Sequence, residues 1–327
     1  MKAANTPQNG RRCAVSIKIV RGGLLTTVQD GGRIGCMKYG FSQCGAMDMR
    51  AFHTANALLS NNAGAAVLEM TVTGIAALFT EDCAICISGA QMEAQINRKP
   101  IRTNKVYEIA AGDVLLCGKV RNGARAYLAV SGGIDVPEFL GSRSTDLKAK
   151  AGGFCGRKLK TGDELKILPH ERLKKIEKRE IPEFEYQNEI CLRAVCGPQD
   201  SMFTKEDINT FFGTKYSVTA EADRMGVRLK GAPLTGKNGM NIISDGIAPG
   251  SVQVPDSGMP IILCADRQTT GGYAKIATVI SADMPLLAQA LPGCKIRFER
   301  ISTAEAENAA KEASRNIKTI KEQINKL

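Results

Sequence analysis

Three polar, glycine-rich blocks carry most of the side chains that could do chemistry in this 327-residue sequence. The first runs from Thr27 to Asp48 and places Gln29, Asp30, Arg33 and Asp48 among five glycines. Glycine lets the backbone turn tightly and approach a ligand, while aspartate and arginine can orient each other or bind polar groups. A structural turn held by an ion pair explains the same residues equally well.

The second block, GSRSTD, begins at Gly141 and combines a guanidinium with hydroxyl groups, which suits an anion. Its candidate residues are Arg143, Ser144 and Thr145. The third block, residues 252–275, surrounds the end of a predicted buried strand, a common place for a binding site. Its candidates are Gln253, Asp266, Arg267, Gln268, Thr269, Thr270, Tyr273 and Lys275.

Other kinds of site have weaker support. His53 and His170 are the only histidines, and no GxSxG sequence accompanies them, so a nucleophile–histidine triad is not expected. Cys83 and Cys86 form a CxxC within a predicted strand, where their side chains point to opposite faces, and no second pair stands at zinc spacing. No metal site is therefore expected. Cys44 lies in a polar loop, where two roles are open: a reactive thiol, or a group that replaces a serine hydroxyl in hydrogen bonding.

Alternating apolar and β-branched residues predict the strands that position these blocks. Turn signals at residues 96–100, 110–113 and 121–125 suit hairpins, so we expect largely antiparallel sheets. Base rates then favour a mainly β protein built of barrels or sandwiches. The predicted strands are residues 15–20, 67–72, 83–88, 106–109 and 114–117.

Helical signals are rarer. They are an apolar stripe at residues 47–59, the capping pair Thr204 and Asp207, Pro285 after Asp283, and the capping box of Ser302 and Glu305 before a charged tail. The charged segment 169–189 lacks strand alternation and predicts a linker. We therefore expect one domain at residues 14–300, with lobes at about 14–168 and 190–300, and a helical tail at 301–327.

Composition narrows the cellular setting. Much of the net charge of +11 lies in residues 172–179 and 311–326, without the interleaved aromatic residues of a single-strand binding surface. No nucleic-acid partner is therefore expected. No apolar stretch has the length of a signal-peptide core or a membrane span, so we expect a cytoplasmic protein with no membrane partner. Eleven irregularly spaced cysteines favour reduced thiols.

The three polar blocks, in the order in which they follow one another along the chain, resemble the signature of a known protein family. The family includes the carboxyltransferase half of urea carboxylase, the C subunit of the bacterial ATP-dependent 5-oxoprolinase, allophanate hydrolase subunit 2, and the antagonist of a sporulation-kinase inhibitor. The resemblance covers about residues 24–300 and takes in residues 55–69, 125–146, 156–165 and the DRMGVRLKG run at 223–231. Cys44, Ser60 and Ala222 depart from the usual serine, glycine and serine, and none of them is a charged motif residue.

The resemblance implies a cyclophilin-like β-barrel architecture with two β-rich lobes. It also implies two companion subunits, an A-type chain and a cyclophilin-like B-type chain, with ATP used through the complex. The implied reaction opens the lactam of 5-oxo-L-proline to give L-glutamate. A biotin-dependent carboxyltransferase acting on an amide or urea-like substrate and a non-catalytic regulator remain alternatives. Because the sequence has no biotin-carrier motif, we favour an oxoprolinase subunit over a biotin-dependent carboxyltransferase.

Both reactions need an anion site and polarisation of an amide. Residue chemistry and motif position therefore predict roles. Arg143 and Arg267 would bind anionic groups, and Asp30 and Asp266 would orient groups or transfer protons. The predicted catalytic residues are Asp30, Arg33, Asp266, Arg267 and Tyr273. The predicted substrate-binding residues are Gln29, Asp48, Arg143, Ser144, Thr145, Gln253, Gln268, Thr269, Thr270 and Lys275.

Overall fold

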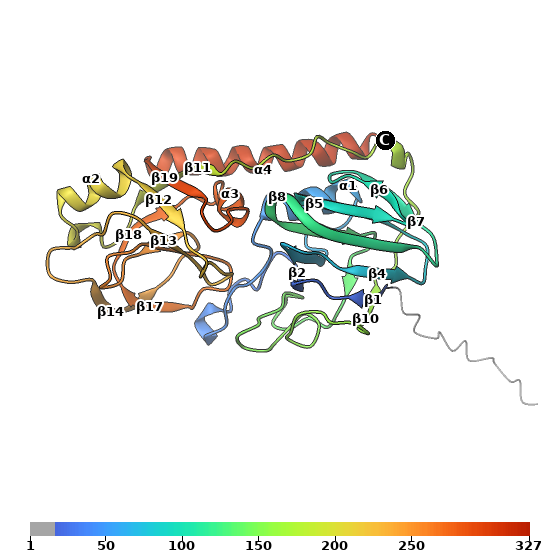
Figure 1. Ribbon diagram of the computed structural model, residues 1–327, viewed down its shortest axis with the longest axis horizontal. Coiled ribbons are helices and arrows are strands. Elements are labelled where there is room, and N and C mark those ends of the chain that lie inside the picture. Colours follow the sequence, from blue (N-terminus) through green and yellow to red (C-terminus); the bar gives the residue numbers. More distant parts are fainter. Residues whose placement is uncertain (1–16) are drawn as a thin grey trace, which may run out of the picture.

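Two β-rich lobes lie side by side in the computed structural model, which describes residues 17–327 (Figure 1). A long C-terminal helix, α4 (Thr303–Asn325), runs along one side of both lobes. The mainly β architecture with barrel-like sheets, few helices and a C-terminal helix is confirmed. All strand pairs between named strands are antiparallel except one, which joins the first and last strands of the second lobe.

The first lobe is a ten-stranded sheet, with β5 and β8 as its two long central strands. Helix α1 (Met49–Leu58) packs against both of them, and the short helix η1 (Met37–Tyr39) precedes it. The strands are β1 (Ile17–Arg21), β2 (Leu25–Gln29), β3 (Val67–Thr71), β4 (Ala76–Phe79), β5 (Cys83–Ile96), β6 (Lys99–Ile101), β7 (Val106–Ile109), β8 (Val114–Val130), β9 (Ile134–Asp135) and β10 (Glu164–Ile167).

The second lobe is a closed seven-stranded barrel with a separate two-stranded ribbon, β14–β17. The barrel closes where β11 and β19 pair in parallel. Its strands are β11 (Glu189–Cys196), β12 (Lys215–Val218), β13 (Gly226–Lys230), β15 (Ser251–Gln253), β16 (Ile261–Leu263), β18 (Lys275–Val279) and β19 (Lys295–Arg300), and the ribbon is β14 (Asn241–Gly246) with β17 (Thr270–Tyr273). The helices are η3 (Asp200–Met202), α2 (Lys205–Gly213) and α3 (Met284–Ala288).

The predicted helix starts are confirmed because their signals are local. Thr204 and Asp207 form the capping box of α2, and Ser302 and Glu305 form that of α4. In each box the side chain of the first residue accepts the amide hydrogen of the third helical residue, and the acidic side chain accepts in return. Pro285 lies in the first turn of α3. The predicted strands also form, although residues 15 and 16 lie outside the described part of the chain.

Two of the three predicted hairpins are wrong. The turn signal at residues 121–125 lies inside β8, which continues to Val130. Gly123 takes a positive φ of 87°, and the pairing of β8 with β5 shifts register between Gln91 and Met92. The glycine therefore accommodates a bulge in a long strand rather than a chain reversal. The turn at residues 96–100 does join antiparallel neighbours, β5 and β6. A turn also forms at residues 110–113, but it connects β7 to β8, which both pair with β5 and not with each other.

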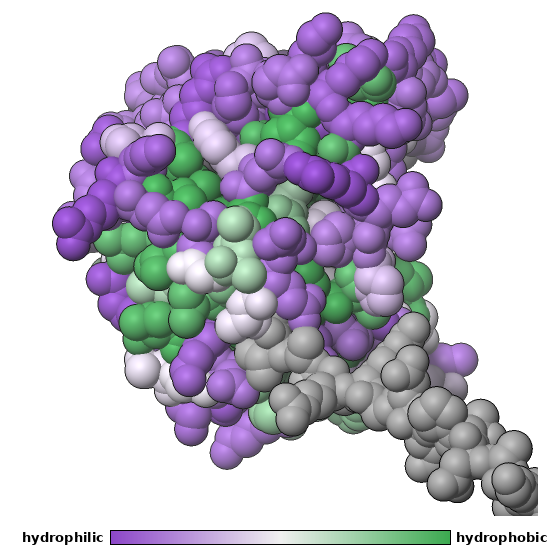
Figure 2. All heavy atoms as spheres, turned by 90° about the vertical axis from the view of Figure 1, so that its right-hand side faces the viewer, coloured by the Kyte–Doolittle hydropathy of each residue, from purple (hydrophilic) through white to green (hydrophobic). Residues whose placement is uncertain are grey.

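Each sheet encloses its own hydrophobic core, and a third cluster lies between α1, the first sheet and the end of α4. The predicted linker 169–189 contains only the short helix η2 (Ile176–Lys178) before β11 begins at its last residue, Glu189. Arg179 anchors it to the first lobe by donating to the Leu58 carbonyl and the Ser60 hydroxyl, each at 2.9 Å. Figure 2 shows the free end of this lobe, where hydrophilic residues surround a smaller hydrophobic area.

Between residues 17 and 327, no helix is long and apolar enough to cross a membrane. Ten of the cysteines belong to this part of the chain, and all ten are free thiols.

Candidate functional site between the lobes

Asp30 organises the contact between the first and second polar blocks. Its carboxylate accepts hydrogen bonds from the Ser142 hydroxyl at 2.7 Å, the Ser144 hydroxyl at 2.5 Å, and the Arg143 and Gly32 amides at 2.6 and 2.8 Å. Four donors leave little capacity for a further proton or ligand on a carboxylate that is only 7% exposed. The geometry therefore favours orientation of the GSRSTD loop over proton transfer as the role of Asp30.

Arg33 holds the same two loops from the interior. Its side chain is fully buried and donates to three backbone carbonyls, those of Phe139, Ser42 and Ser144, at 2.9–3.2 Å. The guanidinium also lies over the Phe139 ring, 5.2 Å from its centre. A Cβ atom at Gly152 would lie 2.8 Å from its terminal nitrogen, so this glycine leaves room for the arginine. Arg33 thus positions backbone and is remote from solvent.

The third block joins the first at the boundary between the lobes. The Ser42 hydroxyl donates to the Arg267 carbonyl at 2.9 Å, and the Cys44 amide donates to the Ala265 carbonyl at 3.0 Å. Arg267 is 2% exposed and donates to the Ile247 carbonyl at 3.0 Å. It forms no ion pair with any of the described carboxylates. Burial disfavours the charged form of the Arg267 guanidinium and therefore lowers its pKa.

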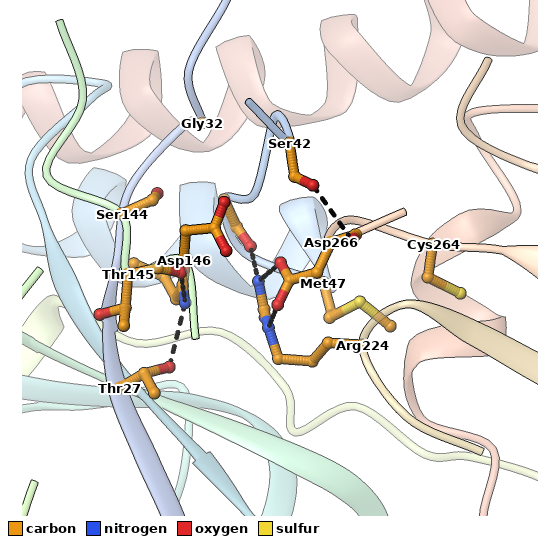
Figure 3. Close-up of polar contacts among 12 residues, drawn as sticks. Thr27, Gly32, Ser42, Met47, Ser144, Thr145, Asp146, Arg224, Cys264 and Asp266 are labelled. Atoms are coloured by element: carbon orange, nitrogen blue, oxygen red, sulfur yellow. Dashed lines mark hydrogen bonds and ion pairs between the residues drawn. The ribbon is translucent and has the colours of Figure 1, made fainter. Parts of the chain in front are cut away.

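A buried ionic cluster connects the lobes at this point (Figure 3). Arg224, from the loop before β13, donates to both oxygens of Asp266 at 2.7 and 2.9 Å. The same guanidinium bonds the Glu69 carboxylate on β3 and donates to the Gly45 carbonyl at 2.8 Å. Glu69 also accepts the Met47 amide at 2.9 Å. One arginine therefore ties the barrel to the first sheet and to the loop before α1.

The pKa values of the two carboxyl groups in this cluster are shifted in opposite directions. Burial raises the pKa of Asp266, and the Arg224 guanidinium opposes that shift. Burial acts in the same sense on Glu69, but Arg224 and Arg125 outweigh it and hold the pKa of Glu69 below its usual value. Burial, and next the Asp266 carboxylate, raises the pKa of the Cys44 thiol. Cys44 therefore stays protonated, which disfavours the reactive-thiol interpretation.

The exposed polar side chains follow this anchored loop. Gln268 and Thr270 are exposed, Thr269 is half-buried, and Tyr273 on β17 is 38% exposed. Gln253 is 3% exposed, and its amide nitrogen would lie only 2.7 Å from a Cβ atom at Gly271. Gly271 therefore permits the close approach of β17 and the Gln253 side chain. Within the third block, the side chains placed to reach a ligand are therefore those of Gln268, Thr269, Thr270 and Tyr273.

Several predicted binding residues are already engaged within the protein. Gln29 donates to the Thr27 hydroxyl at 3.0 Å, and the Thr145 hydroxyl donates to the Val28 carbonyl at 3.0 Å. Arg143 is half-buried and pairs with Glu138 at 2.7 Å. Lys275 is 2% exposed and pairs with Asp245 at 2.8 Å. These contacts position the loops.

Asp48 serves as the N-cap of α1, away from solvent. Its carboxylate accepts the Ala51 amide at 2.9 Å and the Gln289 side-chain amide at 2.8 Å. Gln289 follows α3 in the second lobe, and its carbonyl oxygen also accepts the Ala124 and Arg125 amides at 2.9 Å. A cap of this kind satisfies helix donors that would otherwise lack partners. Asp48 therefore contributes to the lobe boundary.

Sequence reasoning missed Arg224, Glu69 and Gln289 as parts of this boundary. A weak signal existed for two of them: Glu69 is the one acidic residue in an apolar strand, and Arg224 belongs to the DRMGVRLKG run. A charged residue inside an apolar strand has to find a partner when it is buried. Gln289 had no such signal. Between residues 17 and 327, no group of three His, Cys, Asp or Glu residues is arranged to hold a metal ion.

Comparison with known proteins matches this architecture. The family described as carboxyltransferase domain, subdomain A and B, matches residues 39–300. The C subunit of the 5-oxoprolinase of Escherichia coli (strain K12) is 41% identical over 299 residues, which make up 91% of this chain and 96% of that protein. The corresponding C subunit of Haemophilus influenzae 5-oxoprolinase is 39% identical over 280 residues, 86% of this chain and 89% of that protein.

Longer proteins contain a similar region. The urea amidolyase of Lachancea kluyveri is 32% identical over 330 residues, covering 94% of this chain but 18% of that protein. The crystal structure of the Kluyveromyces lactis urea carboxylase matches with a TM-score of 0.88 at 30% identity, over 95% of this chain and 30% of that one. The matched residues include the buried cluster and the third polar block. The chain therefore belongs to the family of 5-oxoprolinase C subunits and biotin-dependent carboxyltransferases.

Proposed function

We propose that this protein is the C subunit of an ATP-dependent 5-oxoprolinase, which converts 5-oxo-L-proline to L-glutamate together with A-type and B-type companion chains. The observation that carries the proposal is the extent of similarity to the bacterial C subunits. The chain corresponds to 96% of the Escherichia coli protein, whereas it corresponds to only 18% of a urea amidolyase. ATP enters the reaction through the complex.

The geometry supports a division of labour among the predicted site residues. Asp30, Arg33, Asp266 and Arg267 are buried and saturated by internal contacts, so we assign them the positioning of three loops at the lobe boundary. Gln268, Thr269, Thr270 and Tyr273 point from the loop after β16 and from β17, where they are exposed or half-buried. Amide and hydroxyl donors held by a rigid base can stabilise charge that develops on a lactam carbonyl oxygen.

Reconstitution tests the proposal. The full chain is mixed with its A-type and B-type companions, and 5-oxoproline-dependent ATP hydrolysis is measured together with glutamate release. We expect both activities to require this chain. Removal of the Tyr273 hydroxyl in Tyr273→Phe is expected to lower kcat by about 100-fold or more, as loss of one stabilising donor does in other enzymes. Tyr107→Phe, on β7 of the first sheet, is the matched control and retains activity.

A second function has its own supporting observation, the similarity to urea amidolyase and urea carboxylase. In that case the protein would transfer a carboxyl group from carboxybiotin to an amide nitrogen, and its activity would require bicarbonate and a biotinylated carrier. Glutamate release without either component supports the oxoprolinase proposal, whereas strict dependence on both overturns it. If the protein assembles with the companion chains but the complex turns over neither substrate, a non-catalytic regulatory role is favoured instead.

A further inference from the structure

A groove of about 970 Å³ lies beneath α4, apart from the site at the lobe boundary. Its walls come from α1, from the end of the loop before α3 and the first turn of α3 (residues 281–286), and from the inner side of α4. Residues 311–316 in the middle of α4 are all exposed, because the helix crosses from one lobe to the other there. Seams between lobes are common places for small-molecule sites, and this volume suits one. None of the residues assigned to the proposed reaction lines it.

The groove carries an excess of positive charge. Arg50, Arg193, Lys318 and Lys321 line it, against the single acidic residue Glu312. Two of the cations have partners: Arg193 pairs with Asp283 at 2.6 Å and Lys318 with Glu322 at 3.8 Å.

Arg50 and Lys321 form no ion pair with any carboxylate described in residues 17–327. Burial, and next the Lys321 ammonium, lower the pKa of His53 in the same groove, so this histidine adds no charge near neutral pH. Two cations without a carboxylate partner, set against the single carboxylate of Glu312, match an occupant with a single negative charge.

Buried polar atoms without partners mark the same wall. The Thr54 side chain is 0% exposed, and its hydroxyl has no hydrogen-bond partner. The Arg50 Nε atom is also buried and without a partner, while its guanidinium is fixed 4.1 Å from the centre of the Phe184 ring and 5.7 Å from that of Tyr186. Buried groups of this kind are rare in native proteins and call for an explanation, such as a ligand.

Much of the remaining lining is apolar and includes Met49, Leu286, Ile317 and Ile320, beside the polar residues Ser281, Ser314 and Asn316. The apolar side chains are only partly buried, so the groove presents apolar surface as well as cations. An occupant therefore needs an aliphatic body and one anionic end. We propose that the groove under α4 binds an aliphatic carboxylate, with its carboxylate at Arg50 and Lys321 and its chain against the apolar side chains of α4 and residues 285–286.

Calorimetric titration of the full-length protein with octanoate tests the site. We expect one saturable octanoate site per chain and clearly weaker binding of the neutral analogue octanamide. Lys321→Gln should raise the Kd for octanoate by about 10-fold, the effect expected for loss of one charge-assisted contact. Lys311→Gln removes an equal charge from an exposed position of α4 outside the groove lining and should leave the Kd unchanged.

A second variant keeps the test independent of charge. Ile317→Trp places a larger side chain in the groove and should abolish octanoate binding while the thermal unfolding midpoint stays close to that of the wild type. Absence of saturable octanoate binding to the wild type overturns the proposal. Equal effects of Lys321→Gln and Lys311→Gln, or equal affinity for octanoate and octanamide, overturn it as well. All of these readouts are independent of 5-oxoproline turnover.

Discussion

At the scale of single residues, the charged motif residues serve mainly to hold loops. Asp30 receives four donors, Arg33 donates to three carbonyls, and Asp266 is held by two bonds from Arg224. A polar motif therefore contains two populations: buried residues that fix the backbone, and exposed residues that can meet a ligand. Composition and spacing do not separate the two, because both need charge and glycine.

Arg224 gives the sharpest test at this scale. Its side chain is 4% exposed and forms ion pairs with both Asp266 and Glu69. Arg224→Leu leaves two buried carboxylates without their shared cation, so we expect the free energy of unfolding to fall by about 3–5 kcal/mol, as when one partner of a buried pair is removed. Urea unfolding monitored by circular dichroism measures this change.

The matched control lies four residues away on the surface. Arg228 pairs with Glu221 at 3.2 Å, and both side chains are more than half exposed. Arg228→Leu should change the free energy of unfolding by less than about 1 kcal/mol because exposed pairs contribute little. Equal losses in the two variants would show that the buried cluster contributes no more to stability than a surface ion pair.

The sequence could predict what depends on near neighbours in the chain. Thr204 with Asp207 and Ser302 with Glu305 act over three residues, and both helices begin at these boxes. The bond between Arg224 and Glu69 joins residues 155 positions apart, so no local pattern announces it. The same limit explains the wrong turn at residues 121–125, where pairing of β8 with the distant β5 overrides a local glycine signal.

At the scale of elements, the β14–β17 ribbon carries the exposed part of the candidate site. Lys275, on the adjacent β18, reaches back to this ribbon and bonds the Asp245 carboxylate and the Gly246 carbonyl at 2.8 and 3.2 Å. The Lys275 side chain is buried, whereas Asp245 is largely open to solvent. This ion pair therefore fastens a two-stranded ribbon to the barrel, since two strands alone are only marginally stable.

This ribbon should loosen in acid. The hydrogen bond from the Lys275 ammonium holds the pKa of Asp245 below its usual value. A carboxyl group whose pKa is lower in the folded state contributes stability above its unfolded pKa of about 3.9 and loses that contribution as the pH falls through the folded value. We expect amide exchange in β14 and β17 to accelerate in acid relative to that in β16, which serves as an internal reference. In Asp245→Asn this relative acceleration should disappear; its persistence would assign the effect to another group.

At the scale of the whole molecule, α4 and the lobe boundary join two separate cores. The boundary is polar, with Arg224 and Gln289 bridging from the barrel to the first sheet. Helix α4 adds an apolar contact, because Ile324 packs into the cluster formed by α1 and the first sheet. Near its start, Ala309 is buried on the side of the barrel. The relative placement of the lobes therefore depends on the tail as well as on the site.

Ile324 tests this dependence because the chain offers an isoleucine in the opposite environment. Ile324 is 5% exposed, whereas Ile243 on β14 is 95% exposed. Ile324→Ala removes buried methyl groups and leaves a cavity, so we expect a loss of about 2–5 kcal/mol in the free energy of unfolding. Ile243→Ala should change it by about 0.5 kcal/mol or less. If both variants unfold at the same urea concentration as the wild type, the end of α4 does not stabilise the fold, and the two lobes are held together by the polar boundary alone.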